Sequence, residues 1–221
     1  MQLKALLLDL DGTLIDTAPD MVGTLNRLLE SEGIAPVEAQ VAARQVSNGA
    51  RALIRHGFGE NLTEQRELQL IENFLSDYAE HVCEDSVIYD GMSEVLTLCQ
   101  DNDIKWGVIT NKPLQLSRDL LEGLNLLNRC SILLGGDSLP VKKPDPAPML
   151  HTCMVLNLAP SECLYVGDHA RDVEAGGNAG MDTAAALWGY LQHDDDASRW
   201  GADYLLKQPA SLAQLLHERF R

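Results

Sequence analysis

The sequence predicts an α/β fold in which a doubly wound, Rossmann-like parallel sheet carries an inserted all-helical segment. Short apolar runs typical of buried strands alternate with segments of helical periodicity over most of the 221 residues. The alternation is interrupted once, because no convincing strand occurs between residues 17 and 84. We therefore expect residues 1–16 and 85–221 to form an α/β core domain, and residues 17–84 to form a helical cap domain.

The predicted strands are short runs rich in apolar residues. Helices cover both faces of a parallel sheet, so its strands read as continuous apolar runs. Runs of this kind occupy residues 3–8, 105–110, 131–134, 163–166 and 183–187.

Helical periodicity fills the segments between several of these runs. The predicted helices occupy residues 93–100, 114–124, 147–156 and 170–179. A closing helix is indicated by Leu212, Leu215 and Leu216, which have the spacing of one apolar helix face.

The predicted insertion contains only helical patterns, separated by turn-rich segments at residues 33–36, 47–49 and 57–59. Pro19 suits the first turn of a helix that begins after Thr17, because the N–H that proline lacks would have no partner there. We therefore expect the first strand to lead directly into helical structure.

The chain is acidic, with 17 Lys and Arg residues against 33 Asp and Glu residues and a net charge of −16. That balance argues against nucleic-acid and anionic membrane partners, because both attract Lys and Arg. The five cysteines are odd in number and no two have CxxC spacing, which favours free thiols in a reducing compartment. With no secretory signal or membrane span in the sequence, we expect a cytoplasmic monomer or homodimer that binds a small molecule.

Chemically active side chains follow four of the predicted strands. In an open α/β sheet, ligands bind beside the carboxyl ends of the strands. The residues there are Asp9, Asp11, Gly12 and Thr13 after the first strand, Thr110 and Asn111 after the second, Lys143 in the loop after the third, and Asp168 and Asp172 after the fourth. Carboxylates, a hydroxyl group and a lysine should therefore converge on one edge of the sheet.

Each of these pieces also has a purely structural interpretation. Thr110 alone is compatible with a helix cap, and Lys143 alone with a solvated charge. A calcium loop that began at Asp9 would need Gly at its sixth position and Glu at its twelfth, where this chain has Gly12 at the fourth and Asp20 at the twelfth. The order of the pieces and their placement at strand ends favour a catalytic site.

These residues resemble the four motifs of the haloacid dehalogenase superfamily. The matching pieces are Asp9-x-Asp11-Gly12-Thr13, Thr110-Asn111, Lys143-Pro144 and Gly167-Asp168-x-x-x-Asp172. The insertion is similar to that superfamily's helical cap, and the chain looks most like bacterial phosphoglycolate phosphatases. Its tail, with Trp188-Gly189-Tyr190 and Trp200-Gly201-Ala202-Asp203, looks more like relatives that act on N-acetylmuramic acid 6-phosphate.

The resemblance implies a phosphatase in which Asp9 attacks phosphorus and Asp11 acts first as an acid and then as a base. It also implies Mg²⁺, bound by the carboxylates of Asp9 and Asp168, by the carbonyl of Asp11, and by Asp172 directly or through water. A phosphate dianion that faces these carboxylates needs such a cation, because the charges otherwise repel one another.

By the same resemblance, Lys143 would offset phosphoryl charge and Thr110 would donate a hydrogen bond to the phosphoryl group. Gly12, Thr13 and Asn111 would complete the phosphate-binding set, with backbone N–H groups near Gly12 and Asn111 as donors.

Several features narrow the reaction within the superfamily. Asp11 indicates phosphoryl transfer, because dehalogenases of this fold lack an acid there. No lysine lies between Lys4 and Lys105, which excludes phosphonate hydrolases that need a cap lysine for an imine. Arg51 in the cap is the candidate for gripping a second anionic group, since guanidinium pairs bidentately with carboxylate; pairing with a surface glutamate is the alternative. His169 departs from the acidic or small polar residue of the relatives.

The predicted function is Mg²⁺-dependent hydrolysis of a small phosphorylated acid or sugar acid, either phosphoglycolate or N-acetylmuramic acid 6-phosphate. The alternatives are a nucleotide or other sugar-phosphate phosphatase, a phosphomutase, and a catalytically silent binding protein.

Overall fold

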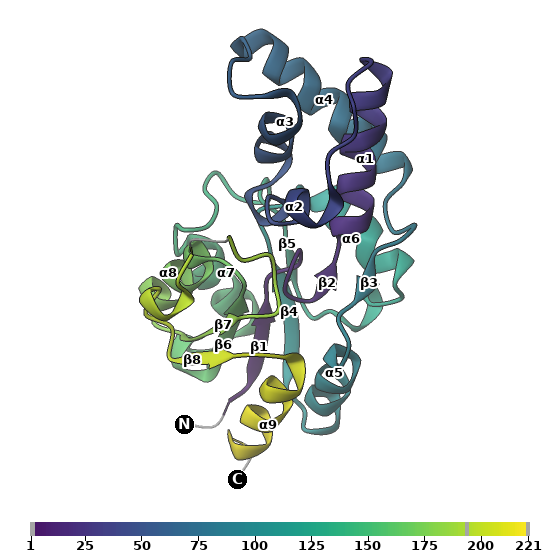
Figure 1. The fold of residues 1–221 in the computed structure, drawn as a ribbon. Helices are drawn as coiled ribbons and strands as arrows, with labels where there is room; N and C mark the ends of the chain where they lie inside the picture. The colour runs from purple at the N-terminus through teal and green to yellow at the C-terminus, as the bar shows by residue number, and fades with distance from the viewer. Residues whose placement is uncertain (1–2, 193–194, 220–221) are drawn as a thin grey trace.

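The computed structural model describes residues 3–192 and 195–219, which form a six-stranded parallel sheet with helices on both faces (Figure 1). The strands are β1 (Ala5–Leu8), β4 (Lys105–Ile109), β5 (Leu133–Leu134), β6 (Cys163–Gly167), β7 (Asp182–Ala186) and β8 (Tyr204–Leu206). They are arranged in the order β5-β4-β1-β6-β7-β8, so the chain winds outward from β1 in both directions. The predicted doubly wound α/β fold class is confirmed.

The central strand β1 is fully buried and pairs in parallel with both β4 and β6. Its last residue, Leu8, lies opposite Val108 of β4 and Val166 of β6. Because the three strands are in this register, the residues that follow them emerge side by side at one edge of the sheet.

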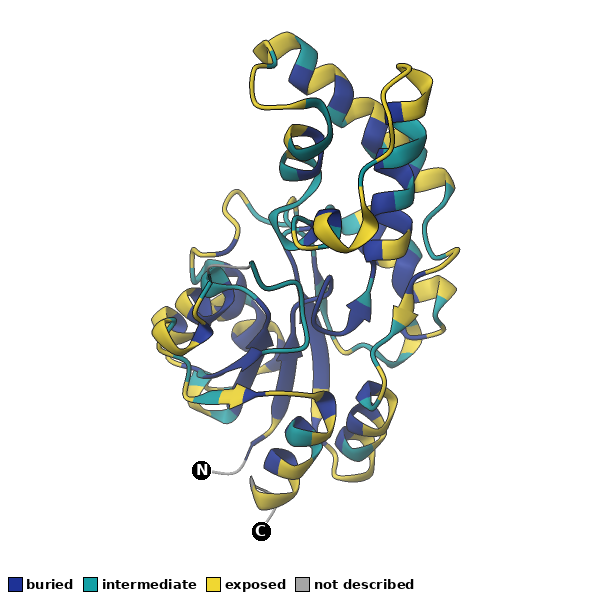
Figure 2. Ribbon diagram, in the orientation of Figure 1, coloured by how far each residue is buried: buried dark blue, intermediate teal, exposed yellow. Residues whose placement is uncertain are grey.

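Two sets of helices cover the two faces of the sheet. They are α5 (Met92–Asp101), α6 (Leu114–Gly123) and α9 (Pro209–Arg219) on one face, and α7 (Ala147–Leu156) and α8 (Ala170–Ala179) on the other. Short 3₁₀ turns lie at Leu127–Arg129, Pro160–Glu162 and Ala197–Arg199. Figure 2 shows the buried sheet between helices whose outer sides are exposed. No helix in the described ranges is both long enough and apolar enough to span a bilayer.

Between β1 and the rest of the core, the chain forms a separate helical body, here called the helical insert. It comprises α1 (Ala18–Ser31), α2 (Ala39–Ala43), the 3₁₀ turn η1 (Val46–Asn48), α3 (Ala50–Phe58) and α4 (Glu64–Glu80). Its core includes Leu25, Leu53 and Phe74, which are fully buried. The expected break at residues 57–59 begins two residues late, because Gly57 and Phe58 still belong to α3 and the chain turns at Gly59, where φ is +89°.

Two short strands connect the helical insert to the core. β2 (Ile15–Asp16) and β3 (Val87–Ile88) pair in antiparallel fashion, so the outgoing and returning chains lie side by side. Asp20 in α1 fastens the return, because its carboxylate accepts hydrogen bonds from the backbone N–H groups of Asp85 and Ser86 and from the Ser86 hydroxyl at 2.5 Å. The insert therefore meets the core next to the carboxyl end of β1 (Figure 1).

Candidate active site

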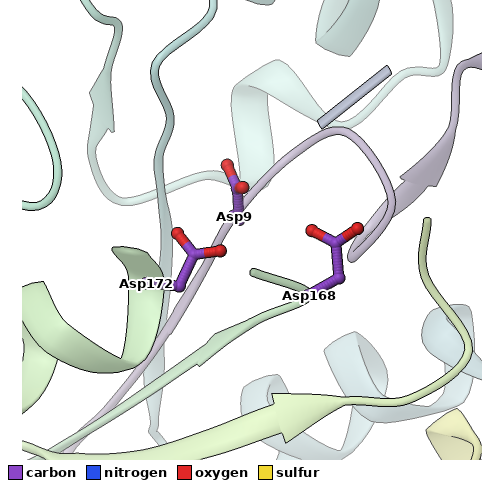
Figure 3. A group of neighbouring side chains, drawn as sticks. All are labelled: Asp9, Asp168 and Asp172. Carbon is purple, nitrogen blue, oxygen red and sulfur yellow. The ribbon is translucent and has the colours of Figure 1, made fainter. Parts of the chain in front are cut away.

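Three carboxylates gather where β1 and β6 end. Asp9 follows β1, Asp168 follows β6, and Asp172 lies in the first turn of α8. One carboxylate oxygen from each lies within 4.8 Å of the others, and all three residues are buried (Figure 3). The predicted meeting of Asp9 with Asp168, residues far apart in the chain, is present in the structure.

Two glycines permit this close packing. Gly12 adopts φ of +78°, and a Cβ atom there would lie 2.2 Å from Oδ2 of Asp168. A Cβ atom at Gly167 would lie 2.3 Å from the Cβ atom of Asp172. Neither position has room for a side chain, so the close approach of the carboxylates depends on both glycines.

Lys143 supplies the positive charge closest to the carboxylates. Its Nζ lies 2.9 Å from Oδ1 of Asp9 and 2.6 Å from Oδ1 of Asp172, and it donates to the Tyr165 hydroxyl at 2.9 Å. Burial alone would lower the pKa of Lys143, but Asp172 and Asp9 outweigh burial and raise it. The lysine is therefore held protonated between two carboxylates.

The pKa values of the carboxylates show that Lys143 alone does not neutralise the negative charge of the site. Burial, partly offset by Lys143 and reinforced by Asp172, raises the pKa of Asp9 to about 6. Burial, then Asp9 and Asp172, raise the pKa of Asp168 to about 8. Oxygen ligands that are buried together and short of positive charge suit a hard divalent cation, so the donor set fits Mg²⁺.

The two carboxylate oxygens of Asp9 have different surroundings. Oδ1 accepts from the backbone N–H of Leu10 at 2.7 Å and is paired with Lys143. No group in the described parts of the chain donates a hydrogen bond to Oδ2. Oδ2 is therefore the oxygen left available for an incoming electrophile.

Asp11 is held by two side chains that the sequence analysis did not identify. Its Oδ1 accepts from the Thr17 hydroxyl at 2.6 Å and pairs with Lys112 Nζ at 2.9 Å. Lys112 is buried and lies 4.3 Å from the centre of the Tyr78 ring, which belongs to α4 of the insert. The only feature of the sequence that could have pointed to Lys112 is its position directly after Thr110 and Asn111.

The remaining predicted phosphate-binding residues fall into two groups. Thr110 and Asn111 line the cavity above the carboxylates; the Thr110 hydroxyl accepts from the Lys112 N–H, and the Asn111 amide donates to the Lys143 carbonyl. Gly12 and Thr13 are not among the residues lining that cavity. Instead Thr13 donates to Oδ1 of Asp168 at 3.4 Å, so these two residues support the carboxylate from behind.

A cavity of about 500 Å³ lies between the carboxylates and the helical insert. Its apolar side includes Val46, Phe74, Leu75, Tyr78 and Leu116, and its basic side includes Arg51, Lys142 and Arg171. The phenol oxygen of Tyr78 and the amide oxygen of Asn111 are buried without a hydrogen-bond partner among the described residues. The cavity thus offers an apolar wall and several cations to a ligand.

Arg51 borders the cavity and is paired with a carboxylate of its own domain. Its guanidinium contacts Glu67 of α4, which also pairs with Arg55. Glu67 is buried, and the Arg55 contact, opposed by burial and aided by Arg51, lowers its pKa. One acid therefore holds two arginines, and only Arg51 of the two lines the cavity.

A second set of contacts joins the insert to the core beside the carboxylates. The Ser47 hydroxyl donates to Oδ2 of Asp168 at 2.7 Å, and Arg171 Nη2 donates to Asn48 Oδ1 at 2.9 Å. His169 caps α8 by accepting from the Arg171 N–H, and burial followed by Arg171 lowers its pKa to about 4. His169 is therefore neutral near pH 7, and Ser47 and Arg171 are contacts that sequence analysis did not predict.

Comparisons with known proteins agree with this geometry. The model of the haloacid dehalogenase-like hydrolase family matches residues 6–186. The chain is 38% identical over 216 residues to an N-acetylmuramic acid 6-phosphate phosphatase of Pseudomonas aeruginosa, covering 98% of this chain and 96% of that one. It is 39% identical to a phosphoglycolate phosphatase of Xanthomonas campestris, covering 95% and 94%. A crystal structure of a predicted phosphoglycolate phosphatase from Haemophilus somnus superposes with a TM-score of 0.87 at 26% identity, covering 97% and 98%.

Proposed function

Because this chain belongs to the haloacid dehalogenase-like hydrolase family, we propose that it is a Mg²⁺-dependent phosphatase that acts through phosphorylated Asp9. The observation that carries the proposal is the group of Asp9, Asp168 and Asp172 around one space, with Lys143 paired to two of them, beneath a cavity. The substrate class is a small phosphorylated acid or sugar acid.

In the first step Oδ2 of Asp9 attacks phosphorus, the bond from phosphorus to the ester oxygen breaks, and an acyl phosphate forms on Asp9. Lys143 holds the other oxygen of Asp9 and keeps the carboxylate oriented. Lys143 and the Thr110 hydroxyl stabilise the negative charge on the phosphoryl oxygens as the bonds exchange.

Asp11 handles the protons in both steps. As the ester bond breaks, its carboxyl group gives a proton to the leaving alcohol oxygen. In the second step the resulting carboxylate takes a proton from water, the water oxygen attacks phosphorus, and Asp9 leaves as a carboxylate. Thr17 and Lys112 position the carboxyl group for both transfers.

The Mg²⁺ ion would be held by the carboxylates of Asp9, Asp168 and Asp172 and by the Asp11 carbonyl. When bound, it supplies the positive charge that lets a phosphate dianion approach Asp9.

We assign residues 1–16 and 85–221 to the catalytic core and residues 17–84 to the substrate-selecting cap. The division follows the β2–β3 ribbon and the separate hydrophobic core of the insert. The cap supplies most of the apolar wall, Arg51, and Thr17, which positions Asp11. The core supplies the residues assigned to phosphoryl transfer, proton transfer and metal binding.

The size of the cavity favours the larger of the two predicted substrates. A volume of about 500 Å³ lies in the usual range for small-molecule sites and exceeds what the ester of a two-carbon acid fills. A phosphorylated sugar acid would place carbon atoms against Phe74 and Leu75 and a carboxylate near Arg51. We therefore propose an N-acetylmuramic acid 6-phosphate-like ester as the preferred substrate, and phosphoglycolate as the weaker one.

A turnover panel tests the proposal. Phosphate release is measured with N-acetylmuramic acid 6-phosphate, phosphoglycolate, nucleoside monophosphates and p-nitrophenyl phosphate, each with Mg²⁺ or with EDTA. We expect Mg²⁺-dependent turnover that is lost in Asp9→Asn and a kcat/KM that is highest for the sugar acid. Normal turnover by Asp9→Asn refutes the nucleophile, and a preference for nucleoside monophosphates refutes the substrate class.

Arg51 is tested with a matched control. Arg51→Ala should lower kcat/KM about 10-fold or more for carboxylated esters, with little change for p-nitrophenyl phosphate, because a charge-assisted pair is lost. Arg55→Ala removes the same kind of ion pair with Glu67 but does not line the cavity, so it should leave the substrate ratio unchanged. Equal losses on both ester types in Arg51→Ala would exclude the assignment.

A further inference from the structure

The segment Trp188-Gly189-Tyr190 packs against the catalytic loops, yet the mechanism above gives it no role. Trp188 Nε1 donates to the Thr13 carbonyl at 3.0 Å. A Cβ atom at Gly189 would lie 2.2 Å from the Cβ atom of Asp168 and 2.4 Å from the Gly12 carbonyl oxygen. The segment is therefore fitted against both the loop after β1 and the loop after β6.

Tyr190 makes hydrogen bonds to two parts of the site at once. Its backbone N–H donates to Oδ2 of Asp168 at 2.9 Å. Its phenol oxygen accepts from the N–H groups of Thr17 at 2.7 Å and Ala18 at 2.8 Å, and the phenol donates to Oδ1 of Asp16 at 2.6 Å. One residue of the core thereby joins the carboxylate group to the first turn of α1.

The phenol oxygen of Tyr190 accepts the first N–H groups of helix α1. Helix α1 begins after Thr17, whose side chain would ordinarily accept a hydrogen bond from the first turn. Here the Thr17 side chain makes no such bond: Pro19, the second helical residue, has no N–H, and the Thr17 hydroxyl donates to Oδ1 of Asp11 at 2.6 Å. Tyr190 accepts the N–H groups at the start of the helix, and Thr17 is left free to hold Asp11.

We propose that Tyr190 is a positioning residue for phosphoryl transfer. Tyr190 fixes the backbone of Thr17, and the Thr17 hydroxyl in turn orients the carboxyl group of Asp11. The inference rests on the proposed function, because it concerns the residue assigned as acid and base.

Loss of the phenol hydroxyl should release Thr17 from Asp11. Without the Tyr190 oxygen, the Thr17 N–H loses its acceptor, and a buried donor without a partner is costly. The Ala18 N–H keeps only its longer contact with Oδ1 of Asp16 at 3.3 Å. The Thr17 backbone then loses the contact that fixes it, and its hydroxyl is no longer held in position beside Asp11. Asp11 keeps Lys112 but loses the second contact that sets the direction of its carboxyl group.

Tyr190→Phe tests this with two leaving groups. The variant keeps the ring and the backbone N–H to Asp168 and removes only the hydroxyl. The value of kcat/KM includes the steps up to departure of the alcohol, which needs a proton from Asp11 for an alkyl ester but not for p-nitrophenolate. We expect kcat/KM to fall about 10-fold or more for a sugar phosphate, within the range of general-acid effects, and to change little for p-nitrophenyl phosphate.

A double-mutant cycle tests whether Tyr190 acts through Thr17. Thr17→Val removes the hydroxyl that holds Asp11 and should show the same difference between the two esters. If Tyr190 acts through Thr17, the double variant should lose no more alkyl-ester activity than Thr17→Val alone. A loss equal to the product of the two single losses overturns the proposal. If Tyr190→Phe does not fold, Thr17→Val alone still tests the proposal. Equal losses of activity by Thr17→Val on both esters would contradict the proposed role of the Thr17 hydroxyl.

Ser86→Ala is the control for general loosening of the insert. It removes the 2.5 Å hydrogen bond to Asp20 at the other chain crossing and touches neither Tyr190 nor Asp11. We expect it to change both esters by the same factor. If Tyr190→Phe lost activity equally on both esters, Tyr190 would only hold the insert to the core, and the positioning role would be wrong. If the unaltered enzyme showed no Mg²⁺-dependent turnover, the proposed function itself would be refuted.

Discussion

Removing Mg²⁺ should make the stability of this protein fall as the pH rises from 5 to 8. In the folded, metal-free protein the pKa of Asp168 is about 8, against 3.8 for the free side chain. Between these values the folded state keeps a proton that the unfolded state has lost. Stability from this group is therefore complete below pH 3.8 and is lost as the pH rises through 8.

The magnitude follows from the three groups that titrate in this interval. At about 1.4 kcal/mol per pH unit, Asp168 contributes about 4 kcal/mol between pH 5 and 8, and Asp9, with a pKa of about 6, contributes about 1 kcal/mol. His169 acts in the opposite direction. Because its pKa is about 4 in the folded protein and 6.5 when free, it lowers the free energy of unfolding at pH 5 by about 2 kcal/mol relative to pH 8. The expected net loss of stability from pH 5 to pH 8 is about 3 kcal/mol.

Urea unfolding followed by tryptophan fluorescence, at pH 5 and pH 8 in EDTA, measures this difference. The same titrations with Mg²⁺ should show a smaller decline, because a bound cation stabilises the ionised carboxylates and the folded state. Asp168→Asn cannot titrate, so in EDTA it should be more stable than the unaltered protein at pH 8. Metal-free protein that is equally stable or more stable at pH 8 would show that the carboxylates do not hold protons as described.

Three other substitutions give distinct outcomes. Gly12→Ala should lower the melting temperature more than Gly33→Ala, because both sites have positive φ but only the first places a Cβ atom against a carboxylate. Lys112→Met should cost about 3 kcal/mol in urea unfolding and reduce turnover of every ester, since Asp11 would lose its buried counter-charge; unchanged values would contradict that pairing. Tyr78→Phe should leave the free energy of unfolding unchanged or raise it, because the hydroxyl that it removes is buried without a hydrogen-bond partner among the described residues. A loss of more than about 1 kcal/mol would contradict this.

The parts of the fold that could be predicted are those with a strong local pattern. β1 and β6 are continuous apolar runs, and the sequence locates both within about two residues. β8 was not predicted, because it is a three-residue edge strand with Leu205 exposed. The β2 and β3 strands have two residues each, too few for any periodicity.

The residues of the site also divide into those that the sequence could place and those that it could not. Asp9 and Asp168 could be placed together because they follow strands that are neighbours in a doubly wound sheet. Lys112 and Tyr190 could not be assigned, because their roles come from packing between segments 101 and 173 residues apart. Arg51 lines the cavity, but its pairing with Glu67 depends on how α3 and α4 meet, which no local pattern specifies.

The narrow ribbon of β2 and β3 gives the protein a modular organisation. Both peptide connections between the helical insert and the core run through these two adjacent crossings. Under the proposed division of roles, the insert can be exchanged at these crossings without altering the core residues assigned to phosphoryl transfer. Grafting a foreign segment between these crossings should transplant preference, provided that the graft retains a threonine to meet Asp11.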